Sequence, residues 1–191
     1  MNIVDATTVV PQPWRNGGGR TRELLTWPAN SDWKLRISQA DIEADGPFSD
    51  FAQVWRWITV IRGGGIVLAF TEGETVLRCG DTPLGFDGGE APGCRLLAGP
   101  VQDLNLMARD GSSIMRRAVQ GEHWEGQCAW RGLYSAGPGR WSNAREACVM
   151  PAHSLLWTDE AGGGAWTFVP EDPRITIGAW WLGYTPHVLF V

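Results

Sequence analysis

Apolar and polar residues alternate with a period of two in short runs along the chain, and Gly, Pro and Asp separate these runs. Such alternation is typical of antiparallel strands that bury one face in a core. The clearest runs are 33–38, 54–62, 66–70, 75–78, 93–97 and 101–107. The sequence has no convincing amphipathic helix of ten or more residues. The pattern therefore predicts an all-β protein built as a sandwich or a barrel.

After about residue 117 the alternation is less regular. We predict strand within 122–133, a loop over 136–143, a short strand at 154–157, a glycine turn at 162–164, and strands at 165–169, 175–184 and 188–191. Three glycines also follow the strand at 54–62, where they separate it from the strand at 66–70. This repeated arrangement of strand, glycine turn and strand indicates a duplicated unit.

Polar residues interrupt two of the apolar strands. Arg56 points to the face opposite Trp55 and Trp57. Asp103 and Asn105 share one face of their own strand. Because an unpaired ion in a protein interior costs about several kcal/mol, these side chains need partners. One interpretation is an internal Arg–Asp pair between strands. The other is that Arg56 holds an acidic ligand while Asp103 or Asn105 contacts its polar end.

The stretch W-R-N-G-G-G-R-T-R-E, residues 14–23, combines an indole, an amide and three glycines. It is not a phosphate-binding P-loop, because the P-loop spacing and its Lys are absent. Consecutive glycines permit positive φ angles and a close approach of the backbone to another group. We therefore keep two interpretations open. The stretch is a plain turn, or it is one wall of a binding site in which Trp14 stacks and Asn16 forms hydrogen bonds.

Charge and composition narrow the classes of partner. The formal charge is -5, and no cluster of Lys or Arg offsets it, so we expect neither nucleic acid nor a membrane as partner. The first residues lack the basic start and apolar run of a signal peptide, which favours a cytoplasmic protein. The three histidines, His123, His153 and His187, are isolated and have no metal-binding spacing.

Five blocks of the sequence, in order, resemble the HutD/Ves family. They are the residues 14–23, 33–40, 46–51, 56–65 and 96–107, and the resemblance covers residues 9 to about 112. It implies a bicupin, which has two cupin-like β-barrels in one chain. We place the first barrel, with the ligand pocket, at 1–112 and a smaller second barrel at 113–191, with an N-terminal strand able to exchange between them.

The resemblance also implies that the usual cupin metal has been lost. When the two cupin metal-binding motifs are placed on this sequence, their ligand positions fall on Ala52, Val54, Ile58 and Ala91. None of these side chains binds metals. We therefore expect neither a metal nor another cofactor. Members of the HutD type are associated with histidine utilisation as modulators of the pathway, and the implied ligand is urocanate, formiminoglutamate or formate.

These observations together predict a non-catalytic protein that binds a small carboxylate, with Arg56 as the anion anchor. The predicted ligand-binding residues are Trp14, Asn16, Gly18, Arg36, Arg56, Asp103 and Asn105. Two alternatives remain open. One is a metal-independent isomerase, lyase or hydrolase that uses Asp103 or Glu23 as general base. The other is an interaction protein without a ligand, whose Trp-rich surface contacts another chain. A homodimer formed through edge strands is a further expectation.

Overall fold

The computed structural model describes residues 1–160, 162, 164–172 and 178–187. Strands dominate these residues, and helix is limited to two 3-10 turns, Ala6–Thr8 and Gly88–Glu90. The all-β prediction is therefore confirmed. The chain divides into two compact units, Val9–Arg109, called here the central unit, and Met1–Thr8 with Asp110–Val191, called the terminal unit.

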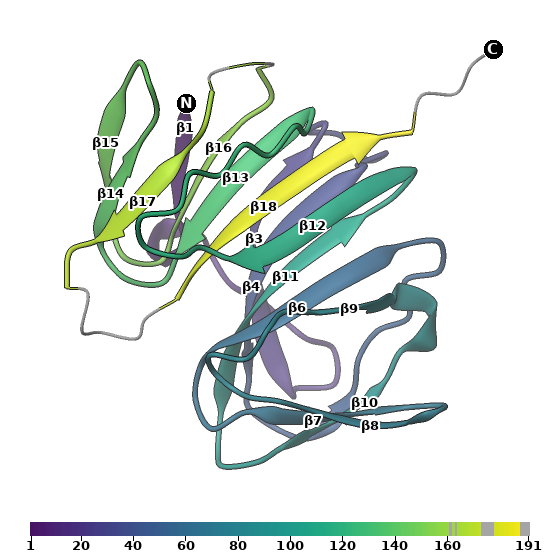
Figure 1. The fold of residues 1–191 in the computed structure, drawn as a ribbon. Coiled ribbons are helices and arrows are strands. Elements are labelled where there is room, and N and C mark those ends of the chain that lie inside the picture. Colours follow the sequence, from purple (N-terminus) through teal and green to yellow (C-terminus); the bar gives the residue numbers. More distant parts are fainter. Residues whose placement is uncertain (161, 163, 173–177, 188–191) are drawn as a thin grey trace. The chain divides into compact units, whose positions relative to one another are not determined.

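Two antiparallel sheets form the central unit (Figure 1). The larger has the order β2 (Gln12–Pro13), β3 (Gly19–Trp27), β4 (Leu35–Ile42), β11 (Val101–Ala108), β6 (Trp55–Arg62) and β9 (Leu84–Asp87). The smaller has the order β5 (Gly46–Pro47), β10 (Gly93–Leu96), β7 (Ile66–Phe70) and β8 (Gly73–Leu77). The strands of this unit thus form two open sheets and do not close into the single hydrogen-bonded barrel that the sequence predicted.

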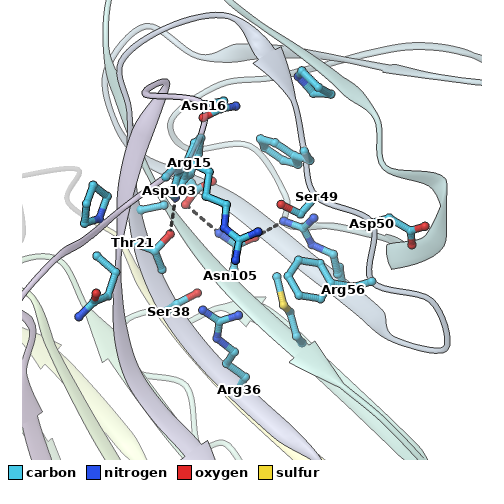
Figure 2. A pocket seen from close by; sticks show the side chains of 18 residues that line it. Arg15, Asn16, Thr21, Arg36, Ser38, Ser49, Asp50, Arg56, Asp103 and Asn105 are labelled. Carbon is cyan, nitrogen blue, oxygen red and sulfur yellow. Dashed lines mark hydrogen bonds between the residues drawn. The ribbon is translucent and has the colours of Figure 1, made fainter.

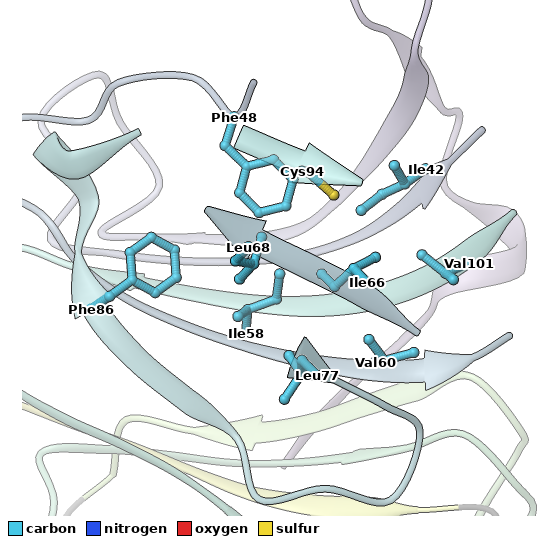
Figure 3. Close-up of a cluster of buried hydrophobic side chains, with 10 residues drawn as sticks. All are labelled: Ile42, Phe48, Ile58, Val60, Ile66, Leu68, Leu77, Phe86, Cys94 and Val101. Carbon is cyan, nitrogen blue, oxygen red and sulfur yellow. The ribbon is translucent and has the colours of Figure 1, made fainter. Parts of the chain in front are cut away.

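The core of the central unit lies where the inner faces of the two sheets meet (Figure 3). Its buried side chains are Ile42, Phe48, Ile58, Val60, Ile66, Leu68, Leu77, Phe86, Cys94 and Val101. Burying a Val, Leu, Ile or Phe side chain stabilises a fold by about 1.5–3 kcal/mol, so this cluster holds the two sheets together. The β-branched and aromatic residues of β6 and β7 also favour the extended backbone.

The terminal unit is likewise built from two antiparallel sheets. The larger has the order β1 (Asn2–Asp5), β16 (Ser154–Thr158), β13 (Trp130–Ser135), β18 (Ala179–Pro186) and β12 (Gly111–Arg117). The smaller has the order β15 (Ala147–Met150), β14 (Gly139–Ser142) and β17 (Thr167–Pro170). Its core is rich in indoles, among them Trp124, Trp141, Trp166 and Trp181.

In the terminal unit one predicted loop is wrong, and other predicted elements fall on residues outside the described part of the chain. The loop predicted at 136–143 is wrong over its second half, because β14 occupies Gly139–Ser142 and pairs with β15 and β17. Residues 161, 163, 173–177 and 188–191 lie outside the described part of the chain. The predicted strand at 188–191, and parts of the predicted turn at 162–164 and strand at 175–184, fall there.

Candidate functional site

The glycine-rich stretch forms the turn between β2 and β3. The Trp14 N–H donates a hydrogen bond to the Gly19 carbonyl (2.9 Å), and the Gly17 N–H donates to the Trp14 carbonyl (3.1 Å). Gly17 has a φ of 71°, which an L side chain rarely adopts. The Gly18 N–H donates to Asn16 Oδ1 at 3.0 Å. The turn is therefore held by its own backbone and by the Asn16 side chain.

Trp14 is fixed at the edge of the core by the strand that follows the turn. Its indole Nε1 donates to Thr21 Oγ1 at 2.8 Å, and its ring packs against the apolar cluster of the central unit. A side chain at Gly19 would meet this ring at 3.2 Å and the Asp41 carbonyl at 2.2 Å. Gly19 is thus required for the hairpin to lie against β4, and the hairpin in turn places Trp14.

A cavity of about 830 Å³ opens beside this hairpin (Figure 2). The hairpin, the loop after β5, and strands β4, β6 and β11 form its walls. Of the predicted ligand-binding residues, the cavity is lined by Trp14, Asn16, Arg36, Arg56, Asp103 and Asn105. Gly18 does not line it and is instead buried behind Asn16.

Strand register explains why these polar side chains meet. On β11, Met107 pairs with both Arg36 of β4 and Arg56 of β6, so the two arginines lie in one row across the sheet. Asn105 and Asp103 follow on the same face of β11, two and four residues before Met107. The period-two pattern of three adjacent strands therefore gathers the polar residues on one inner patch.

Arg56 is the most deeply buried cation at the cavity. It is 4% exposed, and its Nη2 donates to Asn105 Oδ1 at 2.9 Å. The Nε and Nη1 atoms are buried and have no hydrogen-bond partner among the described residues. The guanidinium lies over the rings of Phe48 (4.9 Å) and Phe86 (5.1 Å), and such contacts stabilise a cation.

Burial lowers the pKa of Arg56 to about 10, although the negative charge of Asp103 opposes this shift. Arg56 is therefore still charged at neutral pH, and its guanidinium lines the cavity with part of its hydrogen-bonding capacity unused. A carboxylate has two oxygens with the spacing that a guanidinium fork prefers. The arrangement is chemically suited to hold a small organic acid.

Asn105 lies between Arg56 and Asp103 and joins them. Its Nδ2 donates to Asp103 Oδ1 at 2.8 Å, while its Oδ1 accepts from Arg56. Burial raises the pKa of Asp103 to about 7, and the charge of Arg56 and the hydrogen bond from Asn105 oppose that rise. The buried Arg and Asp are thus linked through an amide, an arrangement that neither sequence interpretation contained.

Two further arginines reach the cavity with different surroundings. Arg36 forms an ion pair with Glu23 of the neighbouring strand, with 2.8 Å between Nε and Oε2. Arg15, which the sequence analysis did not select, is exposed at the tip of the hairpin. Figure 2 shows its side chain directed from the hairpin toward the cavity. One charged residue within a turn follows no periodic pattern, so only its place between Trp14 and Asn16 could have indicated it.

The residues present do not fit a cupin metal. Of the four positions that the cupin motifs assign to metal ligands, Val54 and Ile58 are buried apolar residues. Within the described residues, no group of three or more His, Cys, Asp or Glu side chains is placed to hold a metal ion. Nor does that part of the chain contain a helix long and apolar enough to span a membrane.

Solved structures similar to this chain confirm a cupin-like fold. Oxalate decarboxylase from Bacillus subtilis matches with a TM-score of 0.62 at 9% identity, over 96% of this chain and 76% of that one. Protein Ylba from E. coli matches with a TM-score of 0.70 at 9% identity, over 99% of this chain and 92% of that one. At such low identity the similarity concerns the fold alone.

The alignments with two sequence relatives span a little over half of this chain and a little over half of each relative. A 21.2 kDa protein from the hutC 3' region of Pseudomonas putida is 36% identical over 109 residues, 56% of this chain and 57% of that one. Protein Ves of Citrobacter koseri is 38% identical over 111 residues, 57% of this chain and 58% of that one.

One solved structure is similar to this chain over almost its whole length. The structure of HutD from Pseudomonas fluorescens SBW25 has a TM-score of 0.84 at 26% identity and covers 98% of this chain and 99% of that one. The HutD family model matches residues 6–162. The resemblance inferred from the five sequence blocks is confirmed, and this chain belongs to the HutD family.

Proposed function

We propose that this protein binds a small carboxylate at Arg56 and thereby modulates histidine utilisation. The observation that supports the site most directly is the Arg56 guanidinium, which lines the cavity and has two buried nitrogens, Nε and Nη1, without a hydrogen-bond partner among the described residues. A buried donor without a partner costs about 1–3 kcal/mol, and a bound carboxylate would remove that cost. Family membership, and a relative in the hutC 3' region, support the link to histidine utilisation.

The candidate ligands are urocanate, formiminoglutamate and formate. A volume of about 830 Å³ accommodates each of them, and formate alone would leave most of it to water. The related HutD structure from P. fluorescens carries the description "Formate condition", which makes formate a suitable first probe. A ligand of about twelve heavy atoms, at about 0.5 kcal/mol per atom, gains about 6 kcal/mol. That gain corresponds to a dissociation constant of roughly tens of micromolar.

The fold proposed for this function is a bicupin in which each unit is one cupin domain. Two features support it. Each unit packs a longer sheet against a shorter one, and the similarity to oxalate decarboxylase extends over 96% of the chain. In this proposal β1 has exchanged into the terminal unit, where it pairs with β16. The ligand site belongs to the central unit.

Isothermal titration of the purified chain with the three acids tests the proposal. We expect binding in the micromolar range, weakened at least about 30-fold in Arg56→Met, because loss of a buried charged partner costs about 2 kcal/mol or more. Arg95→Met is the matched control. It also removes one positive charge from the central unit, but Arg95 is exposed and forms an ion pair with Glu74 (3.6 Å). Absence of heat with all three acids at millimolar concentration would contradict the proposal.

Asp103 favours a second candidate function, a metal-independent enzyme that acts on a small acid. It lines the cavity and has a pKa of about 7, which suits a general base at neutral pH. Product analysis after long incubation with the same acids separates the two functions. Turnover that is lost in Asp103→Asn identifies an enzyme, whereas binding without any product supports the non-catalytic proposal.

A further inference from the structure

The hydrogen bonds from Arg56 through Asn105 to Asp103 connect two ionisable groups in the interior of the central unit. Asn105 has one possible orientation there, because its oxygen must face the Arg56 donor and its amide nitrogen the Asp103 acceptor. Asp103 is 1% exposed and Asn105 is 4% exposed, so water screens neither of them effectively. The charge of Arg56 is therefore a principal influence that keeps Asp103 ionised.

A carboxylate bound at Arg56 changes this balance. Two buried anions, the ligand and Asp103, would then share a single buried cation. Like charges in one site disfavour ionisation of one of them. We propose that Asp103 takes up one proton when a carboxylate binds at Arg56, so that the site binds the carboxylate together with a proton. This inference rests on the proposed function and adds the protonation that accompanies binding.

The other ionisable groups whose charges interact with that of Asp103 are unsuited to accept this proton. On β4, burial raises the pKa of Asp41, but hydrogen bonds from Arg22 and Gln102 outweigh burial and leave that pKa below its usual value. On β10, burial and the charges of Asp103 and Asp45 raise the pKa of the Cys94 thiol to about 12, so it is already protonated.

The remaining charged groups lie at the walls and rim of the cavity. Arg36 on β4 is held by Glu23. The loop after β5 brings Asp50, and the hairpin brings Arg15, and both are exposed to water. Of the described carboxylates around the Arg56 guanidinium, Asp103 is the one that is buried and connected to it by hydrogen bonds through Asn105.

Proton uptake by Asp103 determines how the dissociation constant of the carboxylate changes with pH. Below a pH of about 7 free Asp103 is already protonated, so binding needs little proton uptake. Above it Asp103 is ionised and must gain a proton as the ligand binds. The dissociation constant then rises with pH, by up to about tenfold per pH unit while uptake approaches one proton.

Calorimetric titration of the full chain with urocanate, in phosphate and in imidazole buffer, measures this proton, because both buffers titrate at about pH 7. The two buffers differ widely in ionisation enthalpy, so the difference between the binding enthalpies gives the number of protons exchanged. We expect uptake of about 0.9 proton at about pH 8 and about 0.1 at about pH 6. Formate, which has no second titratable group, is the control that excludes titration of the urocanate ring.

Asp103→Asn is the matched variant, because it keeps the shape of the side chain and cannot ionise. Its binding should show no proton uptake and no rise of the dissociation constant between about pH 6 and pH 8. The wild-type measurement decides by itself if the variant does not fold. Binding with zero uptake, or with proton release, overturns the inference and leaves the proposed function intact. Absence of binding in both buffers would reject the proposed function, and the inference with it.

Discussion

At the residue scale, the three arginines of the cavity have different surroundings and therefore different roles. Arg56 is buried and hydrogen-bonded to Asn105, and Arg36 forms an ion pair with Glu23. Arg15 is exposed at the hairpin tip and has no acidic partner among the described residues. We interpret Arg56 as the anchor of the ligand and Arg15 as the first cation that an approaching anion meets.

Substitution of Arg15 by Gln should slow association with a carboxylate more than it speeds dissociation. An exposed charge at the mouth of a site acts mainly by long-range attraction, which salt screens. We expect the association rate to fall about two- to fivefold at low salt and to become less sensitive to salt. Stopped-flow measurement of tryptophan fluorescence, with Arg95→Gln as control, tests this. Equal association rates and salt slopes for Arg15→Gln and wild type would contradict the assignment.

Two glycines of the hairpin differ in how much space surrounds them. A methyl group at Gly19 would lie 2.2 Å from the Asp41 carbonyl, whereas at Gly18 it would meet Asn16 Oδ1 at 3.4 Å. We therefore expect Gly19→Ala to destabilise the chain by about 1–3 kcal/mol, the usual cost of overpacking. Gly18→Ala should change stability by less than about 1 kcal/mol. Urea unfolding of both variants checks the difference, and equal losses would show that the contact at Gly19 relaxes freely.

The polar patch was predictable from the sequence only in part. Alternation along β6 and β11 put Arg56, Asp103 and Asn105 on the inward faces, and the structure brings these three together. Phe48, whose ring lies under the Arg56 guanidinium, belongs to a loop. The position of a loop residue cannot be predicted from the alternation of apolar and polar residues. Gly18 was assigned to the cavity but does not line it, because its N–H donates to Asn16 Oδ1 and its carbonyl accepts from the N–H groups of Glu43 and Ala44.

At the scale of elements, strands β6 and β13 begin with the same dipeptide, Trp-Arg. The arginine at the start of β13, Arg131, is buried like Arg56 and lies over the Trp166 ring at 4.7 Å. Its guanidinium, however, donates to the carbonyls of Gly162 and Gly164. Backbone oxygens therefore accept hydrogen bonds from the Arg131 guanidinium, whereas Nε and Nη1 of Arg56 have no partner among the described residues.

Arg131→Met should consequently lower stability without affecting carboxylate binding. Two hydrogen bonds from a charged donor are lost, and each contributes about 1.5–3 kcal/mol when the donor is ionised. We expect a loss of about 2 kcal/mol or more in the free energy of unfolding, measured by urea denaturation. The dissociation constant for the carboxylate should stay within about twofold of wild type, in contrast to Arg56→Met. A large loss of affinity in Arg131→Met would assign Arg131 a part in binding.

The elements that the sequence predicted best are those with undisturbed alternation. Predicted runs at 54–62, 66–70 and 101–107 match β6, β7 and β11 closely. The longest strand, β3, was missed because its register shifts between Glu23 and Leu25, which breaks the period of two. Strand β14 was missed because Gly and Pro dominate the residues before it, and these residues are typical of loops.

At the scale of the whole molecule, carboxylates whose pKa is shifted act on stability in two opposite directions. Hydrogen bonds from Thr7 lower the pKa of Asp5, and those from Arg22 and Gln102 lower the pKa of Asp41 against the effect of burial. Asp5 and Asp41 therefore stabilise the fold at pH values above the pKa that each has in the unfolded chain. This stabilisation is lost as the pH falls through their lower pKa values in the folded protein. Asp103, whose pKa is raised, acts in the opposite direction.

The sign for Asp103 follows from its two pKa values, about 7 in the folded protein and 3.8 in the unfolded chain. Between these values the folded protein binds more protons than the unfolded chain, so stability falls as pH rises through this window. By linkage, the free energy of unfolding should be roughly 3 kcal/mol lower at pH 8 than at pH 5.

Urea unfolding of the chain without ligand, followed at pH 5 and pH 8, measures this difference, and Asp103→Asn is the comparison. Since Asn cannot ionise, the variant should lose most of the difference between the two pH values and should equal or exceed wild type at pH 8. A saturating carboxylate should restore wild-type stability at pH 8 through binding to the folded state. If wild type unfolds with the same free energy at both pH values, Asp103 does not carry a destabilising buried charge, and the proton linkage of the site loses its physical basis.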